Sequence, residues 1–196
     1  MLAYQLLRPF GYIVIHHPAK RIVDWYVPAV LLILSVLAIL PFRDGMNVWA
    51  SSGLVSSAQG FIQGLPGFYI AALAAVATFG SQGSTLDRVI PEPTPTLSTR
   101  FAGAWIDMKL TRRRFLCFLF SYLTALSIVL CMYAYYAQAV AVPARKVFPQ
   151  AIDALSWIAI SLYIFFVFQL IVITMWGLYY LGDRMHQPDP HAPPPP

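Results

Sequence analysis

The chain has 196 residues, of which 59% are hydrophobic and 11% are charged, and its formal net charge is +5. Soluble domains carry about 25% charged residues, so this chain has too few charges to cover a water-facing globule. The composition predicts an integral membrane protein without a separate soluble domain. Because the basic residues flank apolar segments, membrane topology explains them better than nucleic-acid binding does.

Residues 1–22 mix apolar and polar side chains, and Pro9 and Gly11 interrupt any helix there. This stretch is too short and too broken to cross a bilayer. We expect an N-terminal interfacial segment that lies at the membrane surface or packs on the cytoplasmic end of the helices. It has no small-residue cleavage site, so it does not resemble a cleaved signal peptide.

Four apolar stretches predict transmembrane helices over about 23–42, 61–80, 115–136 and 155–181. A helix rises about 1.5 Å per residue and the hydrocarbon core is about 30 Å thick, so each stretch can cross it. The predicted fold is an all-α polytopic membrane protein with a four-helix domain over 23–182. The last span exceeds the membrane thickness and must tilt or project from it.

The first span opens with the interfacial aromatic residues Trp25 and Tyr26. Pro28 lies close to its start, where a missing backbone N–H costs least. Asp24 is expected at the cytoplasmic mouth of this span beside Arg21, where pairing or water can serve it.

The second span contains the spacing Gly60-x-x-x-Gly64, followed by Pro66, Gly67 and several alanines. Small residues let helices approach closely in lipid, so these glycines are candidate helix-packing or oligomer contacts. Two structures remain open for this stretch. One is a Pro-kinked helix in the bundle, and the other is a short re-entrant helix that lines a cavity, as in channels.

A cytoplasmic linker over 81–114 joins the second and third spans. Its apolar residues from Ser98 to Arg114 recur at steps of three and four, which predicts a cytoplasmic amphipathic helix. Arg100 and Trp105 on this segment are candidate partner-docking residues. So are Pro193 and Pro194 in the Pro-rich cytoplasmic tail, 183–196, which is otherwise typical of disorder.

Three arginines, Arg112, Arg113 and Arg114, run directly into the third span, and with Lys109 they are expected at the lipid headgroups. Small and polar residues share one arc of this span at about 100° per residue. We expect that arc to face a neighbouring helix, with hydroxyls bonded across to it or back to their own backbone. Its members are Cys117, Ser121, Thr124, Ser127 and Cys131.

The distribution of Lys and Arg predicts the orientation. Residues 1–24 carry three, the linker carries six and the tail carries one, which makes ten on one side. The opposite loops carry three: Arg43, Arg145 and Lys146. This bias predicts that both termini are cytoplasmic.

The spans contain little that could perform chemistry. No ionisable residue is expected near the middle of a span, and all four histidines lie in the terminal segments, so no catalytic base, metal or cofactor site is predicted. Gln169 is the one amide deep in a span. It could form an interhelical or intersubunit hydrogen bond, or it could line a pore.

These observations favour a non-enzymatic membrane subunit that forms a homo-oligomer and either senses the state of the membrane or anchors a cytosolic protein. The alternative is an ion channel or pore lined by Gly60–Gly67, Gln169, Ser121 and Thr124. The size, the four spans and the two internal termini resemble the membrane subunit of the Kiwa anti-phage defence system of bacteria. That resemblance is one of layout and assigns no site residues. It implies a homotetramer that detects phage attack at the bacterial inner membrane and works with a cytosolic, DNA-binding partner.

Overall fold

The protein was analysed as a computed structural model, which describes residues 2–42, 45, 47–78, 85–90, 93–101 and 104–184. Four of its helical stretches are long and apolar enough to cross a membrane, in the order that the sequence predicts. They are Pro18–Phe42, Leu54–Thr78, Arg112–Val147 and Ile152–Gly182.

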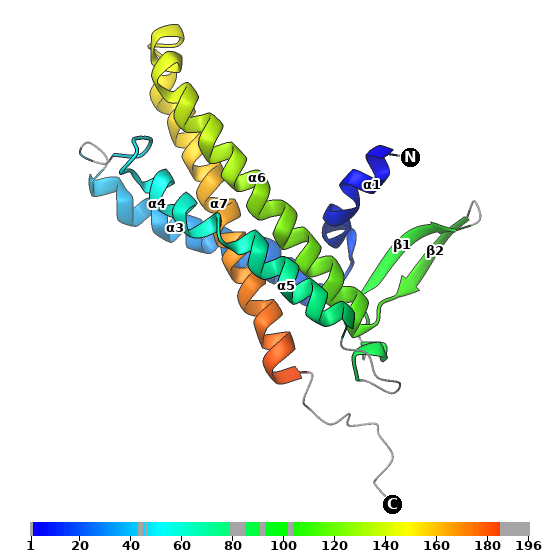
Figure 1. Cartoon of the computed structure of the whole chain (residues 1–196). Coiled ribbons are helices and arrows are strands. Elements are labelled where there is room, and N and C mark those ends of the chain that lie inside the picture. The colour runs from blue at the N-terminus through cyan, green and yellow to red at the C-terminus, as the bar shows by residue number, and fades with distance from the viewer. Residues whose placement is uncertain are drawn as a thin grey trace, which may run out of the picture.

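Two long antiparallel helices, α6 (Arg112–Val147) and α7 (Ile152–Tyr179), form the centre of the molecule (Figure 1). The helix α5 (Leu65–Thr78) packs along α6, and α3 (Val27–Ile39) crosses α7. The 36 residues of α6 rise about 54 Å, well beyond a hydrocarbon core. The helix therefore continues through most of the region expected to be an outer loop.

The second span consists of two helices, α4 (Leu54–Ile62) and α5, separated by a turn at 63–64. Both pack against α6 and run on in the same general direction (Figure 1). The break therefore does not reverse the chain. This geometry corresponds to the kinked helix among the two structures left open by the sequence.

The first span begins with a short helix, α2 (Pro18–Arg21), and a wide π-helical turn, η2 (Ile22–Tyr26), before α3 and η3 (Leu40–Phe42). The backbone N–H of Val27 bonds the carbonyl of Ile22, five residues earlier. Pro28 explains the wide turn because it has no N–H and its ring crowds the carbonyl of Asp24, four residues earlier. The Asp24 carbonyl is thus left to find a donor elsewhere.

The N-terminal segment comprises α1 (Leu2–Leu7) and the 3₁₀ helix η1 (Arg8–Val14), and η1 packs on the flank of α6. Gly11 allows this close approach, because a Cβ there would lie 3.2 Å from the Phe118 ring. The Arg8 guanidinium lies over the same ring, 5.2 Å from its centroid.

The amphipathic helix predicted from Ser98 is wrong over most of its length. Residues Thr96–Phe101 (β1) and Ala104–Lys109 (β2) form an antiparallel hairpin, and the helix begins only at Arg112. The reason is visible in the sequence, where β-branched and aromatic residues lie on both sides of a two-residue Ala-Gly connection. The hairpin follows a short 3₁₀ turn, η4 (Thr85–Asp87), and Thr111 caps α6 by accepting from the Arg114 N–H at 3.4 Å.

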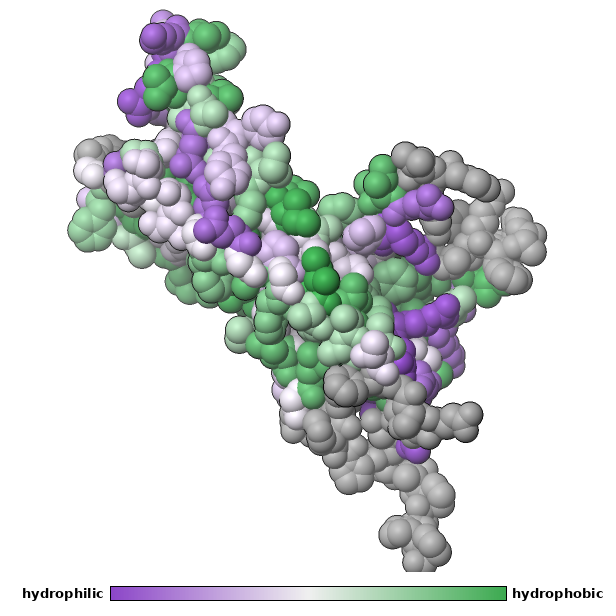
Figure 2. Space-filling view, in the orientation of Figure 1, coloured by the Kyte–Doolittle hydropathy of each residue, from purple (hydrophilic) through white to green (hydrophobic). Residues whose placement is uncertain are grey.

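The buried core follows α6, and large apolar side chains cover the outside of the long helices. Phe115, Leu119 and Leu123 are almost fully buried, whereas Leu37 on α3 and Val142 on α6 are 59% and 70% exposed. Hydrophilic side chains gather at the tip of the α6–α7 pair and around the hairpin (Figure 2). An outward apolar surface of this extent is what a lipid environment requires.

Candidate functional site: a buried polar network

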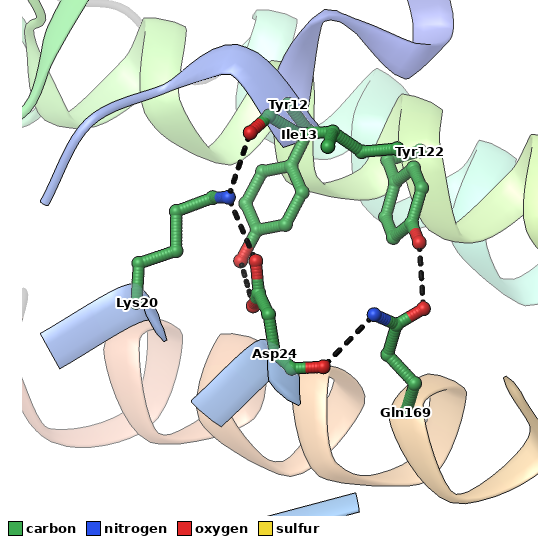
Figure 3. Close-up of polar contacts among 6 residues, drawn as sticks. All are labelled: Tyr12, Ile13, Lys20, Asp24, Tyr122 and Gln169. Atoms are coloured by element: carbon green, nitrogen blue, oxygen red, sulfur yellow. Dashed lines mark hydrogen bonds and ion pairs between the residues drawn. The ribbon is translucent and has the colours of Figure 1, made fainter. Parts of the chain in front are cut away.

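Five side chains from four separate segments meet beside α6 and α7, and we call this set the polar network (Figure 3). It joins η1, the start of the first span, and the two central helices. Its members are Tyr12, Lys20, Asp24, Tyr122 and Gln169.

The centre of the network is an ion pair between Lys20 Nζ and Asp24 Oδ2, 2.7 Å apart, with side chains only 6% and 4% exposed. One helical turn separates the two residues, so local geometry brings them together. Lys20 Nζ also donates to the Ile13 carbonyl at 3.3 Å and lies 4.5 Å from the centroid of the Tyr12 ring. The expected neighbour of Asp24, Arg21, is exposed instead.

Tyr12 completes the coordination of the carboxylate, since its hydroxyl donates to Asp24 Oδ1 at 3.0 Å. Burial, followed by the negative charge of Asp24, raises the pKa of Tyr12 well above its ordinary value of 10.0. The phenol therefore stays protonated and remains a donor at neutral pH. Its ring also stacks on that of Tyr122, with centroids 5.1 Å apart.

Gln169 supplies the donor that the first span lacks. Its Nε2 donates to the Asp24 backbone carbonyl at 2.9 Å, and its Oε1 accepts from the Tyr122 hydroxyl at 2.8 Å. Pro28, four residues after Asp24, has no backbone N–H to donate to this carbonyl. Gln169 thus forms interhelical hydrogen bonds within one chain, with both ends of its amide engaged.

The network lies deeper along the central helices than the sequence suggests. Tyr122 is ten residues, or about 15 Å, from the start of α6, and Gln169 lies well inside α7. Asp24 is the seventh residue of the first candidate span, Pro18–Phe42, and its side chain is buried. Its place at the cytoplasmic mouth of that span stays a prediction. The start of the first span reaches these positions, and α3 crosses α7 instead of running parallel to it (Figure 1).

The three arginines predicted at the headgroups have different environments. Arg113 donates to both carboxylate oxygens of Asp87, at 2.9 and 3.0 Å, and to the Ala77 carbonyl at 3.1 Å, so it ties the end of α5 to the start of α6. Arg112 is buried, while Arg114 is exposed and contacts the sulfur of Met108. Lys109 is exposed at the end of β2, opposite Thr96.

Two members of the polar stripe of the third span bond back to their own helix. Thr124 Oγ1 donates to the Phe120 carbonyl at 2.8 Å, and the buried Ser127 donates to the Thr124 carbonyl at 2.9 Å. Ser121 lines a shallow cleft with Arg8 and Arg114. The Thr124 and Ser127 hydroxyls thus take the second of the two arrangements expected for them.

The glycines of the second span make no close approach to another helix within the chain. A Cβ at Gly60 or Gly67 would meet nothing within 4 Å, and one at Gly64 would meet only the nearby Phe61 carbonyl, at 4.0 Å. Gly177 on α7 is the tightly packed one, because a Cβ there would lie 3.0 Å from Leu119 Cδ2. Contact of the other glycines with a second copy of the chain stays a prediction.

Two of the predicted docking residues, Arg100 and Trp105, are paired in the hairpin register, and their side chains lie outside the described residues. Pro193 and Pro194 also lie outside the described residues. In the part of the chain that the structure describes, no three His, Cys, Asp or Glu side chains are grouped as a metal site would need.

Sequence reasoning missed most of the polar network. The spacing of Lys20 and Asp24 is a signal that was present, because oppositely charged residues four apart share one helical face. Tyr12 and Tyr122 give no local signal, since their contacts connect segments 12 and 47 residues apart in the chain.

Comparison with known proteins adds no assignment to this geometry. No family model matches the chain, and neither a curated protein nor a solved structure matches it.

Proposed function

We propose that this chain is a non-enzymatic integral membrane subunit whose N-terminal segment is a latch that responds to the state of the membrane. The observation that carries the proposal is the polar network, which ties residues 12–24 to Tyr122 on α6 and Gln169 on α7. In this buried ion pair both carboxylate oxygens and the ammonium are bonded within the chain, which suits an element that holds one conformation.

The latch could also bind at the membrane interface. Leu6, Leu7 and Val14 are 68%, 63% and 52% exposed, so the segment already presents an apolar outer face to its surroundings. Such a segment is compatible with the membrane interface as well as with the flank of α6. Its position against α6 is held by the polar network together with aromatic packing, in which Tyr12 stacks on Tyr122 and Gly11 and Arg8 contact Phe118.

Membrane damage would weaken those bonds directly. Thinning or leakage admits water, and the attraction between two charges falls steeply as the local dielectric rises. The Lys20–Asp24 pair is closed off from solvent and is thus sensitive to such a change. Release of the segment is the expected response.

A second contact offers a route for the signal. His16 and Thr96 exchange two backbone hydrogen bonds, at 3.0 and 3.3 Å, so the latch is joined to β1 of the hairpin. Movement of the latch would pull on that strand. The hairpin carries Arg100 and Trp105, which we propose as the docking surface for a cytosolic protein.

The resemblance in size, number of spans and location of the termini to the Kiwa membrane subunit suggests that the protein acts in anti-phage defence. A homotetramer in a bacterial inner membrane, with cytoplasmic termini and a cytosolic partner, is what the resemblance to the Kiwa membrane subunit implies. Pull-down of the tagged protein from detergent should recover a stoichiometric soluble partner, and Arg100→Ala with Trp105→Ala should reduce that recovery at least several-fold. A clean oligomer without a partner would contradict this part of the proposal.

The pore alternative is less well supported by the same contacts. A conduit needs polar groups that face it, whereas both ends of the Gln169 amide are bonded inside the chain. Planar-bilayer recordings of the purified protein separate the two functions, because steps of current would favour the pore and a silent bilayer would favour the sensor.

The latch itself is tested by hydrogen exchange of the N-terminal segment in nanodiscs. Lys20→Met leaves the Asp24 carboxylate unpaired, and breaking a buried pair costs about 3–5 kcal/mol, so the backbone amides of residues 10–17 should exchange much faster. Lys20→Met combined with Asp24→Leu removes both charges and should restore much of the protection. Arg21→Gln, the exposed neighbour, is the matched control.

Thinner lipids should produce the same loss of protection in the wild-type protein. If residues 10–17 exchange at one rate in all lipids and in all variants, the latch proposal fails.

A further inference from the structure

A cleft of about 460 Å³ with both polar and apolar lining residues lies at the tip of the α6–α7 pair and shares no residue with the polar network. Positions 138, 141, 142 and 145 of α6 face positions 153, 156, 157 and 160 of α7, and residues 47–50 form the third wall. Both helices thus contribute one face, with steps of three and four residues. Hydrophilic side chains gather at this tip (Figure 2).

The third wall is held in place by the start of α4. The backbone N–H groups of Leu54 and Val55 donate to the carbonyls of Asn47 and Val48, at 3.1 and 3.2 Å. Gly53 makes this possible, because a Cβ there would lie 2.7 Å from each of the same two carbonyl oxygens. The loop therefore forms a defined side of the cleft.

The cleft contains two opposite charges, Arg145 in the last turn of α6 and Asp153 in the first turn of α7. Arg145 and Asp153 both line it and are exposed, and within the described part of the chain neither takes part in an ion pair or a side-chain hydrogen bond. Two indoles, Trp49 and Trp157, lie with them in the lining and are partly buried. A guanidinium binds a phosphate, and a carboxylate between aromatic faces binds an ammonium.

We propose that this cleft binds the zwitterionic headgroup of a phospholipid, with the phosphate at Arg145 and the ammonium at Asp153 beside the two indoles. A phosphate joined to an ammonium is the shared chemistry, and a free soluble zwitterion would offer it too. The surroundings favour a lipid, because Val142 and Ile158 at the cleft helices are 70% and 66% exposed and provide apolar surface for acyl chains. This inference is independent of the latch.

The experiment uses the purified full-length protein in detergent, titrated with dihexanoyl phosphatidylethanolamine while tryptophan fluorescence and the thermal unfolding midpoint are followed. Dihexanoyl phosphatidylglycerol tests the ammonium, because it keeps the phosphate and lacks that group. Phosphoethanolamine tests the acyl chains. We expect saturable binding of the ethanolamine lipid and about tenfold weaker binding of the phosphatidylglycerol, the loss expected for one charge-assisted contact. Phosphoethanolamine should also bind more weakly than the ethanolamine lipid, because it has no acyl chains to bury.

Two substitutions locate the site. Arg145→Gln should weaken both lipids, whereas Asp153→Asn should weaken only the ethanolamine lipid and so abolish the preference between them. Lys146→Gln is the matched control, because Lys146 is a basic neighbour that does not line the cleft. Both substituted side chains are exposed, so the unliganded unfolding midpoint should not change.

Three results would overturn the proposal. They are equal affinity for the two lipids, unchanged binding in both cleft variants, and phosphoethanolamine binding as tight as that of the lipid. The last result would assign the cleft to a soluble zwitterion.

Discussion

Pro28 leaves a backbone carbonyl of the first span without its helical donor, and Gln169 supplies that donor. Pro28 removes the N–H that an α-helix would offer to the Asp24 carbonyl, and Gln169 donates to that carbonyl from a different helix, 145 residues away. In lipid the alternative is an unpaired carbonyl, because no water is available to satisfy it. The pairing therefore also fixes where α3 crosses α7.

Gln169→Leu should destabilise the protein by about 1–3 kcal/mol, because the Asp24 carbonyl and the Tyr122 hydroxyl lose their partner. The cost should fall when Pro28→Ala returns an N–H to the helix. An SDS titration of the four proteins in a double-mutant cycle measures this, with Gln63→Leu at an exposed site as control. Additive effects would refute the coupling.

At the scale of elements, close packing of the central pair depends on Gly177. A Cβ at this position would already lie 3.0 Å from a terminal carbon of Leu119, a flexible side-chain end that has some room to yield. A larger side chain has no such room, because Leu119 and the nearby Phe120 are buried.

Gly177→Leu should therefore cost about 1–3 kcal/mol of stability by overpacking, and Gly177→Ala should cost clearly less. Gly67→Ala is the matched control, since nothing lies within 4 Å of a Cβ there. Thermal unfolding of the detergent-solubilised variants gives the comparison. A neutral Gly177→Leu would mean that the two helices are not packed closely at this point.

The hairpin is the element that sequence periodicity predicted incorrectly. Apolar residues between Ser98 and Lys109 coincide with helical spacing, but the residue types favour strands, and Phe101 pairs with Ala104 in an antiparallel ladder. Pairing of β1 with His16 adds a tertiary contact that no local pattern contains. By contrast, long apolar stretches depend on composition alone, so the four spans could be predicted with only their ends in error.

Cysteine cross-linking distinguishes the hairpin from the helix. Ser98 and Asp107 are directly opposite in the register, within the range of Cα separations that a disulfide can bridge. In a helix nine residues would separate them by about 13 Å. With Cys117 and Cys131 replaced by Ala, Ser98→Cys with Asp107→Cys should cross-link readily, whereas Ser98→Cys with Lys109→Cys, two positions out of register, should not.

For the whole molecule, the prediction is its orientation in the membrane. Ten of the thirteen Lys and Arg residues lie on the side of the termini, the linker and the tail. Replacement of Arg112, Arg113 and Arg114 by Ala lowers this bias to seven against three, so the cytoplasmic location of both termini should persist in most molecules. Maleimide labelling of single cysteines at position 2 and position 185, in a background without Cys117 and Cys131, reports the location of each end.

The bond between Gln169 and the first span has a consequence for biosynthesis. The ribosome completes the first three spans before it reaches the one that carries Gln169. Until then the Asp24 carbonyl lacks the hydrogen bond from the Gln169 amide. The network can close only at the end of translation. A chain truncated before residue 152 should therefore be inserted but remain incompletely folded, and a membrane-bound protease should degrade it faster than the full-length protein.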